Sequence, residues 1–219
     1  MRRIPALAAA LTLALTACAG GSTQIPEPDE DGMISFGCAL AADSHDWDEG
    51  LSADSDEAIV PLPLGVSVIF GSQTATPMAG YEDFEMLGQD LAKASSALDV
   101  ESTNDLLTDV VEQCDEQGVS YEDIPTDKDA IAEFSCSLVD MAVSSDTPIE
   151  DWLLPAQEDN IEINAIAAAG MFLATKELKE SDAYSQFYDD AIGVVEATST
   201  LQPELIETHM EAIDSMCEE

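Results

Sequence analysis

Residues 34–40 of this chain read ISFGCAL, and residues 132–138 read AEFSCSL, so a Phe, a Cys and a Leu recur at the same spacing 98 residues later. Further along the chain the matching residues are 103 apart. They include Tyr81 and Tyr184, Phe84 and Phe187, Leu91 and Val194, Leu98 and Leu201, and Cys114 and Cys217. A period this long indicates a duplicated domain rather than a solenoid repeat. The change of spacing predicts five extra residues in the second copy, in the loop near Thr147 to Asp159.

Apolar residues recur in both copies at spacings of three, four and seven, which is the pattern of amphipathic helices. Phe84, Leu87 and Leu91 form one such stripe, and Pro203 is suited to the first turn of the last helix. The pattern predicts four helices in each copy. Their approximate ranges are 34–46, 60–74, 80–99 and 103–117 in the first copy, and 129–144, 159–179, 182–200 and 203–217 in the second.

The segment from Ile59 to Gly71 is ambiguous by itself. Its run VSVIF at residues 66–70 favours a strand, whereas its counterpart at residues 164–173, NAIAAAGMFL, is typical of a buried helix. Equivalent copies share a fold, so a helix that starts near Pro63 is the better prediction. The fold class is therefore all-α, with two tandem four-helix units.

Each copy contains one cysteine near its start and one near its end. An even number of cysteines in an oxidising compartment indicates disulfides, and four cysteines allow three pairings. The duplication favours Cys38–Cys114 and Cys136–Cys217, because each unit is then complete before it is doubled. These pairs would staple the first helix of each unit to its last.

The N-terminus carries two arginines followed by an apolar run from Ile4 to about Ala17. The run is shorter than the roughly 20 residues that a membrane-spanning helix needs, and it is typical of a cleavable secretory signal. It ends in Leu15-Thr16-Ala17-Cys18, which resembles the bacterial lipoprotein signal at all four positions. The resemblance implies cleavage before Cys18, attachment of diacylglycerol to its thiol, and further acylation by a fatty acid such as palmitate.

The predicted domain organisation follows from these observations. Residues 1–17 form the signal peptide, and residues 18–32 form a lipidated flexible tether rich in Gly, Ser, Pro and acids. The first helical repeat spans 33–118, a linker spans 119–128, and the second repeat spans 129–219. Two or three acyl chains anchor a protein durably, so the predicted location is extracytoplasmic, at the bacterial cell membrane.

The chain beyond the signal is strongly acidic. It contains four lysines and no arginine against 46 acids, which gives a formal charge of 4 − 46 = −42. Nucleic acid is excluded as a partner, because phosphate binding needs Lys and Arg. An anionic small-molecule substrate is not expected for the same reason. The compatible partners are the membrane through the acyl anchor, and a protein or peptide with a cationic surface. A coat of solvated acids, suited to high salt, is the simplest reading of the charge.

Two acid-rich stretches are weak candidates for a cation site. Residues 27–32, EPDEDG, look in part like the first half of an EF-hand calcium loop, but position 12 of that loop would be Cys38 rather than Glu. A denser cluster contains Asp43, Asp46, Asp48 and Glu49. Hard cations such as calcium prefer oxygen ligands, although this spacing matches no known motif. No other cofactor is expected.

Trp47 and Trp152 are weak candidates for a binding groove, and packing at the end of a bundle is the simpler interpretation. His45 and His209 are the two histidines, and His209 aligns with Leu106 beside an apolar stripe. No nucleophile elbow, phosphate loop, zinc signature or dinucleotide fingerprint occurs. The sequence therefore predicts a non-catalytic surface or binding lipoprotein. The alternatives are a low-affinity calcium-binding lipoprotein and, more weakly, a hydrolase that uses two carboxylates.

Overall fold

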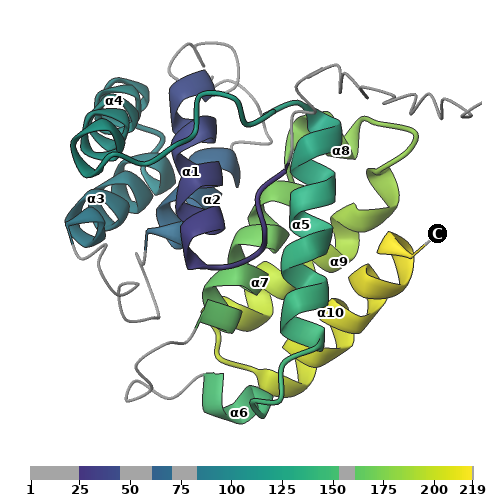
Figure 1. The fold of residues 1–219 in the computed structure, drawn as a ribbon. Coiled ribbons are helices and arrows are strands. Elements are labelled where there is room, and N and C mark those ends of the chain that lie inside the picture. The colour runs from purple at the N-terminus through teal and green to yellow at the C-terminus, as the bar shows by residue number, and fades with distance from the viewer. Residues whose placement is uncertain (1–24, 45–60, 71–82, 153–160, 219) are drawn as a thin grey trace, which may run out of the picture.

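The structure is a computed structural model that describes residues 25–44, 61–70, 83–152 and 161–218. Every regular element in these ranges is a helix (Figure 1). The first unit contains α1 (Glu30–Ser44), α2 (Pro61–Ile69), α3 (Phe84–Ser96) and α4 (Val100–Gln117). The second contains α5 (Lys128–Val143), α7 (Ile161–Leu173), α9 (Tyr188–Ser199) and α10 (Pro203–Cys217). The all-α class and the helical conformation of residues 61–69 are confirmed.

Three short elements are additional to this scheme. They are α6 (Ile149–Trp152), α8 (Lys176–Lys179) and the 3₁₀ turn η1 (Ser185–Phe187). The α6 turn lies in the loop where the second copy was predicted to be longer. The single helix predicted over 159–179 is instead two helices, because α7 ends at Leu173 and α8 begins only at Lys176.

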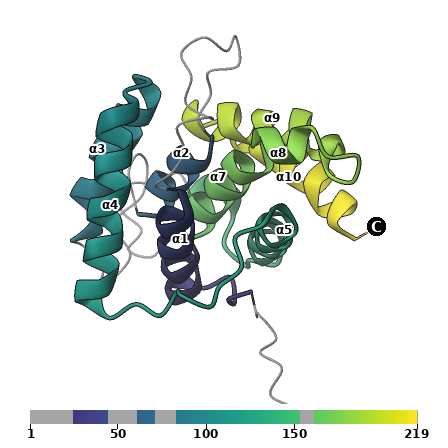
Figure 2. The same ribbon diagram turned by 90° about the horizontal axis from the view of Figure 1, so that it is seen from above.

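The two units pair their helices in the same way. In the first unit α1 packs against α2 and α4, and α3 packs against the same two helices. In the second unit α5 packs against α7 and α10, and α9 packs against that pair. The units meet mainly through α2 and α7, which are counterparts, so the two halves of the molecule are related by an approximate twofold axis. Figures 1 and 2 show α3 and α4 at one end, α9 and α10 at the other, and the remaining long helices between them.

A single hydrophobic core crosses this axis. The rings of Phe36 and Phe134, which are equivalent residues of the two repeats, stack with centroids 4.0 Å apart. The ring of Phe172 meets Phe36 edge-on at 6.1 Å. All three side chains are fully buried and belong to one cluster that includes residues of both units. The repeats are therefore two structural units that share one core.

The disulfides Cys38–Cys114 and Cys136–Cys217 are both formed. The first joins α1 to α4 and the second joins α5 to α10, so each bond closes the ring of helices in its own unit. Cys38 and Cys114 are fully buried, whereas Cys136 and Cys217 are partly exposed. Two disulfides within one chain indicate that the folded protein is located in an oxidising, extracytoplasmic environment.

The helices that lie deepest are apolar on all sides. No charged residue occurs in α1 between Asp31 and Asp43, and in α7 Glu162 is the one charged residue. Residues 162–170 are all buried, as are residues 32–34 and 36–41. A helix that is hydrophobic around its whole circumference has to be covered on all faces. The charges are consequently carried by the outer helices.

The duplication extends to a detail of the backbone. Leu98 and Leu201, which are 103 residues apart, both have positive φ, at 56° and 54°. Each ends a helix with the same hydrogen bonds. The amide of Asp99 bonds the carbonyl of Ala94 at 3.0 Å, and the amide of Gln202 bonds that of Ala197 at 3.0 Å. This is the pattern of a left-handed helix end, which favours glycine over leucine.

Leu201→Gly is expected to leave the fold intact and raise the free energy of unfolding by up to about 1 kcal/mol. The left-handed conformation costs a residue with a Cβ roughly 1–2 kcal/mol, and the Leu201 side chain is 51% exposed, so little packing is lost. Leu98→Gly is the matched variant, and its gain is expected to be smaller because Leu98 is half-buried. Urea denaturation measures both. A loss of stability in Leu201→Gly would contradict this account of the turn.

The start of the folded unit lies earlier than the sequence indicates. The first helix begins at Glu30 rather than 34, because Asp29 caps it: its Oδ1 accepts a hydrogen bond from the amide of Gly32 at 2.8 Å. Ile25 packs against the core. Residues 25–32 are therefore part of the folded unit, and the predicted tether over 18–32 is too long. Residues 18–24 lie outside the described residues.

Candidate functional site

The sequence-predicted site residues are not brought together in the described part of the chain. Cys18, Trp47, Asp46, Asp48 and Glu49 lie outside the described residues. The exposed Asp43 is described at the end of α1. Its Oδ2 accepts a hydrogen bond from the Thr126 hydroxyl at 2.8 Å, which ties the linker between the repeats to the first helix. The next residue, Asp127, caps α5, because its side chain accepts hydrogen bonds from the amides of Asp129 and Ala130.

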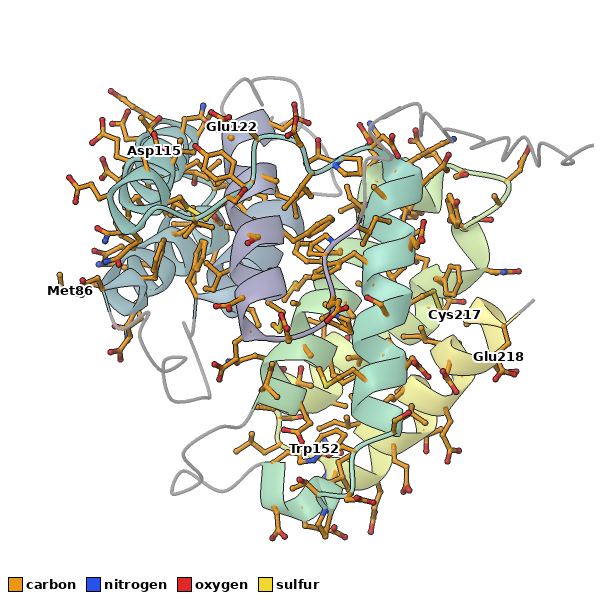
Figure 3. All side chains as sticks on the ribbon, viewed as in Figure 1. Met86, Asp115, Glu122, Trp152, Cys217 and Glu218 are labelled. Carbon is orange, nitrogen blue, oxygen red and sulfur yellow. A yellow bond between two sulfur atoms is a disulfide. The ribbon has the colours of Figure 1, made fainter. Side chains whose placement is uncertain are left out.

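Trp152 is not an exposed platform. Its side chain is 3% exposed, and its Nε1–H donates to the carbonyl of Thr147 at 3.1 Å. It lies in the short helix α6, which contacts α10 at one end of the second unit. Figure 3 shows it inside this end of the molecule. The residue therefore closes the core of the bundle there, in line with the simpler interpretation, and its ring is not exposed in the conformation described.

The acid-rich stretch 27–32 has a local structural use. Asp29 caps α1, and its own carbonyl accepts a hydrogen bond from the amide of Met33 at 2.8 Å. Glu30 and Asp31 lie in the first turn of the helix, where the positive end of the helix dipole stabilises negative side chains. Within the ranges that the structure describes, no group of three or more His, Cys, Asp or Glu side chains is placed to hold a metal ion.

The second unit contains a polar pair where the first has leucines. The Nδ1 of His209 on α10 lies 2.8 Å from Oδ1 of Asp190 on α9, and both side chains are roughly one-third exposed. The equivalent positions in the first unit are Leu106 and Leu87. The imidazole lies against Gly193, where a Cβ would collide with the ring. The alignment of His209 with Leu106 signalled a departure between the copies, but only the fold shows that Asp190 is its partner.

Replacing Asp190 and His209 together by leucine is expected to change the free energy of unfolding by less than about 1 kcal/mol, because the first unit uses leucine at both positions. Asp190→Leu alone is expected to cost more, since it leaves a partly buried imidazole without its hydrogen bond. A double-mutant cycle by urea denaturation measures the coupling. Purely additive effects of the two substitutions would show that the pair is not an energetic unit.

Most acidic side chains lie on the outer surfaces of the helices. The sequence of α4 contains six acids and no basic residue, and α10 contains four acids. Lysine is scarce beside them: Lys176 lies 4.0 Å from Glu180 in an exposed pair, and Lys179 covers the ring of Tyr188 at 4.2 Å. Exposed pairs of this kind contribute little to stability. The field of the surface is therefore negative over both ends of the molecule.

Several acids also accept local hydrogen bonds. Asp99 caps α4, and hydrogen bonds from the side chain and amide of Ser102 lower its pKa below the usual value. The hydroxyl of Tyr121 donates to Asp115 at 2.8 Å, and that of Tyr184 donates to Asp129 at 3.0 Å. Partial burial and then these carboxylates raise the pKa of both phenols. Figure 3 places Asp115 and Glu122 at the same end of the first unit.

Among the described residues, Glu162 is the one carboxylate that is buried, with 8% of its side chain exposed. Its Oε1 accepts a hydrogen bond from the hydroxyl of Ser145 at 2.7 Å. The pair joins the end of α5 to the first turn of α7, where the helix dipole also favours a negative group. A hydrolase of the two-carboxylate type needs a second acid facing the first across a cleft. The group that contacts the Glu162 carboxylate is the hydroxyl of Ser145 rather than a second acid.

No protein family model matches the sequence, and neither the curated proteins nor the solved structures contain a significant match to the chain. Within the described ranges, no helix is both long enough and apolar enough to cross a membrane. The features that bear on function are consequently those of the molecule itself: its disulfides, its acidic exterior and the sequence of its N-terminus.

Proposed function

We propose that this protein is a lipid-anchored, non-catalytic binding protein on the outer side of the bacterial cell membrane, where it contacts a cationic protein or peptide. The observation that carries the proposal is the separation of charge in the fold. The deepest helices are almost free of charged residues, while the outer helices carry the acids with few lysines among them. A surface of one sign attracts partners of the opposite sign and can raise association rates by roughly 10- to 1,000-fold.

The anchor is supported by the sequence Leu15-Thr16-Ala17-Cys18 and by the oxidised cysteines of the folded part. Both indicate export. The folded part begins by Ile25, so six residues separate it from Cys18.

Mass spectrometry of the mature chain from the membrane fraction tests the anchor. The expected N-terminal residue is Cys18 with a thioether-linked diacylglycerol. Cys18→Ser is expected to leave both disulfides and the melting temperature unchanged and to lose the lipid. Recovery of an unmodified N-terminal peptide from membranes would argue against a lipoprotein.

The alternative function is low-affinity binding of calcium or another divalent cation. The melting temperature of a soluble, oxidised chain from Thr23 to Glu219 separates the two functions when it is measured in calcium chloride and in sodium chloride of matched ionic strength. An equal rise in both salts means that the acids are screened as a general coat. A rise in calcium alone that saturates at low millimolar concentration means a specific site, because a ligand stabilises the state it binds.

Cross-linking on intact cells tests for a protein partner, with two variants of equal charge change. Asp105, Asp109 and Glu112 lie exposed on α4, and Glu204, Glu207 and Glu211 lie exposed on α10. Neutralising each set to the amides removes three charges. A defined partner is expected to lose its cross-link with one set and keep it with the other, and to be released by salt. Identical cross-linking in wild type and both variants would exclude an electrostatic contact on these helices.

A further inference from the structure

The point at which the chain enters the folded unit is fixed on one side of the molecule. Residues 25–29 run beside α1 and α5 in both views (Figures 1 and 2). Ile25 is half-buried against the core, and Asp29 is held by its capping hydrogen bond to Gly32. The carbonyl of Glu27 also approaches Gly32 so closely that a Cβ there would collide with it. We call residues 25–29, with the parts of α1 and α5 beside them, the exit face.

The chain between the anchor and the exit face is short. Six residues, 19–24, separate Cys18 from Ile25. Seven steps between Cα atoms span at most about 25 Å even when fully extended. A folded unit of this size has a radius of gyration of about 16 Å and hence a diameter of about 40 Å. A Cys18 held at the bilayer surface could not reach Ile25 if the opposite side of the unit rested on the membrane.

On the basis of the proposed lipid anchor, we infer that the short tether keeps the exit face turned toward the membrane, because a chain of this length cannot reach around the folded unit. The partner of this surface is the lipid bilayer itself. The side that carries α2, α7 and α9 then faces away from the membrane, and the acidic α3–α4 hairpin lies at the flank. A cationic partner would meet the protein from these sides rather than from the exit face.

Energy transfer from single dye positions to a headgroup-labelled acceptor tests this orientation. The full lipidated chain is reconstituted in phosphatidylcholine vesicles. Each variant carries one introduced cysteine, and the dye is attached to it after the native pairs have been oxidised to disulfides. Glu27→Cys places it on the exit face, and Ser199→Cys places it on α9; both positions are exposed. We expect transfer from position 27 to be about twofold or more higher than from position 199. Equal transfer, or higher transfer from position 199, would overturn the inference.

A longer tether is the matched control. About 20 Gly and Ser residues inserted after Gly21 keep the anchor but exceed the diameter of the folded unit, so the difference between the two positions is expected to shrink. An unchanged difference would show that the tether does not set the orientation. Vesicle flotation is recorded for every sample. Loss of flotation in the wild type would contradict the anchor itself, whereas flotation with equal transfer would contradict only the orientation.

Discussion

Replacing Cys38 and Cys114 together by alanine is expected to lower the free energy of unfolding by about 4–5 kcal/mol. The bond closes a loop of 76 residues in sequence separation, and a cross-link over such a loop removes this much conformational entropy from the unfolded chain in the chain-entropy model. Both cysteines are fully buried, so a small cavity adds to the loss. Since small proteins are stable by about 5–15 kcal/mol, the effect is a large part of the total.

Urea denaturation of the oxidised wild type and of the double variant measures the difference. The pair Cys136→Ala and Cys217→Ala is the matched control, because its bond spans 81 residues and the same model gives a similar loss. Its cavity term is expected to be smaller, since those cysteines are partly exposed. A denaturation midpoint that does not move in the Cys38 and Cys114 variant would show that the first unit does not depend on its disulfide.

Phe134→Ala is expected to cost about 3–5 kcal/mol, because it empties a fully buried aromatic position. Phe36→Ala should cost a similar amount. The two rings stack across the approximate twofold axis, so their effects should not add: a stacked pair is worth about 0.5–1.5 kcal/mol beyond its burial. A double-mutant cycle measures this coupling between the two repeats.

Phe84→Ala is the control that separates the loss of a buried ring from the loss of the contact between the repeats. Phe84 is fully buried too, but it stacks on Phe70 within the first unit, with ring centroids 4.7 Å apart. Its loss should be of the same size and should add to that of Phe134→Ala. Coupling of Phe84 to Phe134 as strong as that of Phe36 would contradict the assignment of the stacked pair as the contact that joins the repeats.

Much of the fold could be predicted from the sequence because the duplication provides two versions of each element to compare. The ambiguous residues 66–70 could be assigned to a helix only through their counterpart at 164–173. The duplication likewise selected one disulfide pairing out of three. Helix ends were less predictable. Asp29 and Asp99 begin α1 and α4 earlier than the apolar pattern does, because a capping side chain acts on the backbone and leaves no trace in the periodicity.

The candidate site was less predictable than the fold. Asp43 and Trp152 stood out by composition, and the structure gives each a hydrogen bond that explains it locally. The pair of His209 and Asp190 joins residues of two helices. The sequence could not show which of the 46 acids is the partner of His209. The exit face depends on where the chain meets the folded unit, which no pattern in residues 25–29 reveals.

The sequence by itself determined the helical class, the duplication and the disulfide partners, because each is a matter of local pattern or of spacing along the chain. Only the tertiary structure decided that the repeats share one core, that Phe36 meets Phe134, and which side of the molecule the N-terminal segment leaves. These three features depend on how apolar helix faces that are distant in sequence pack against one another. Burial drives that association without direction, so its geometry emerges only when all the helices are packed together.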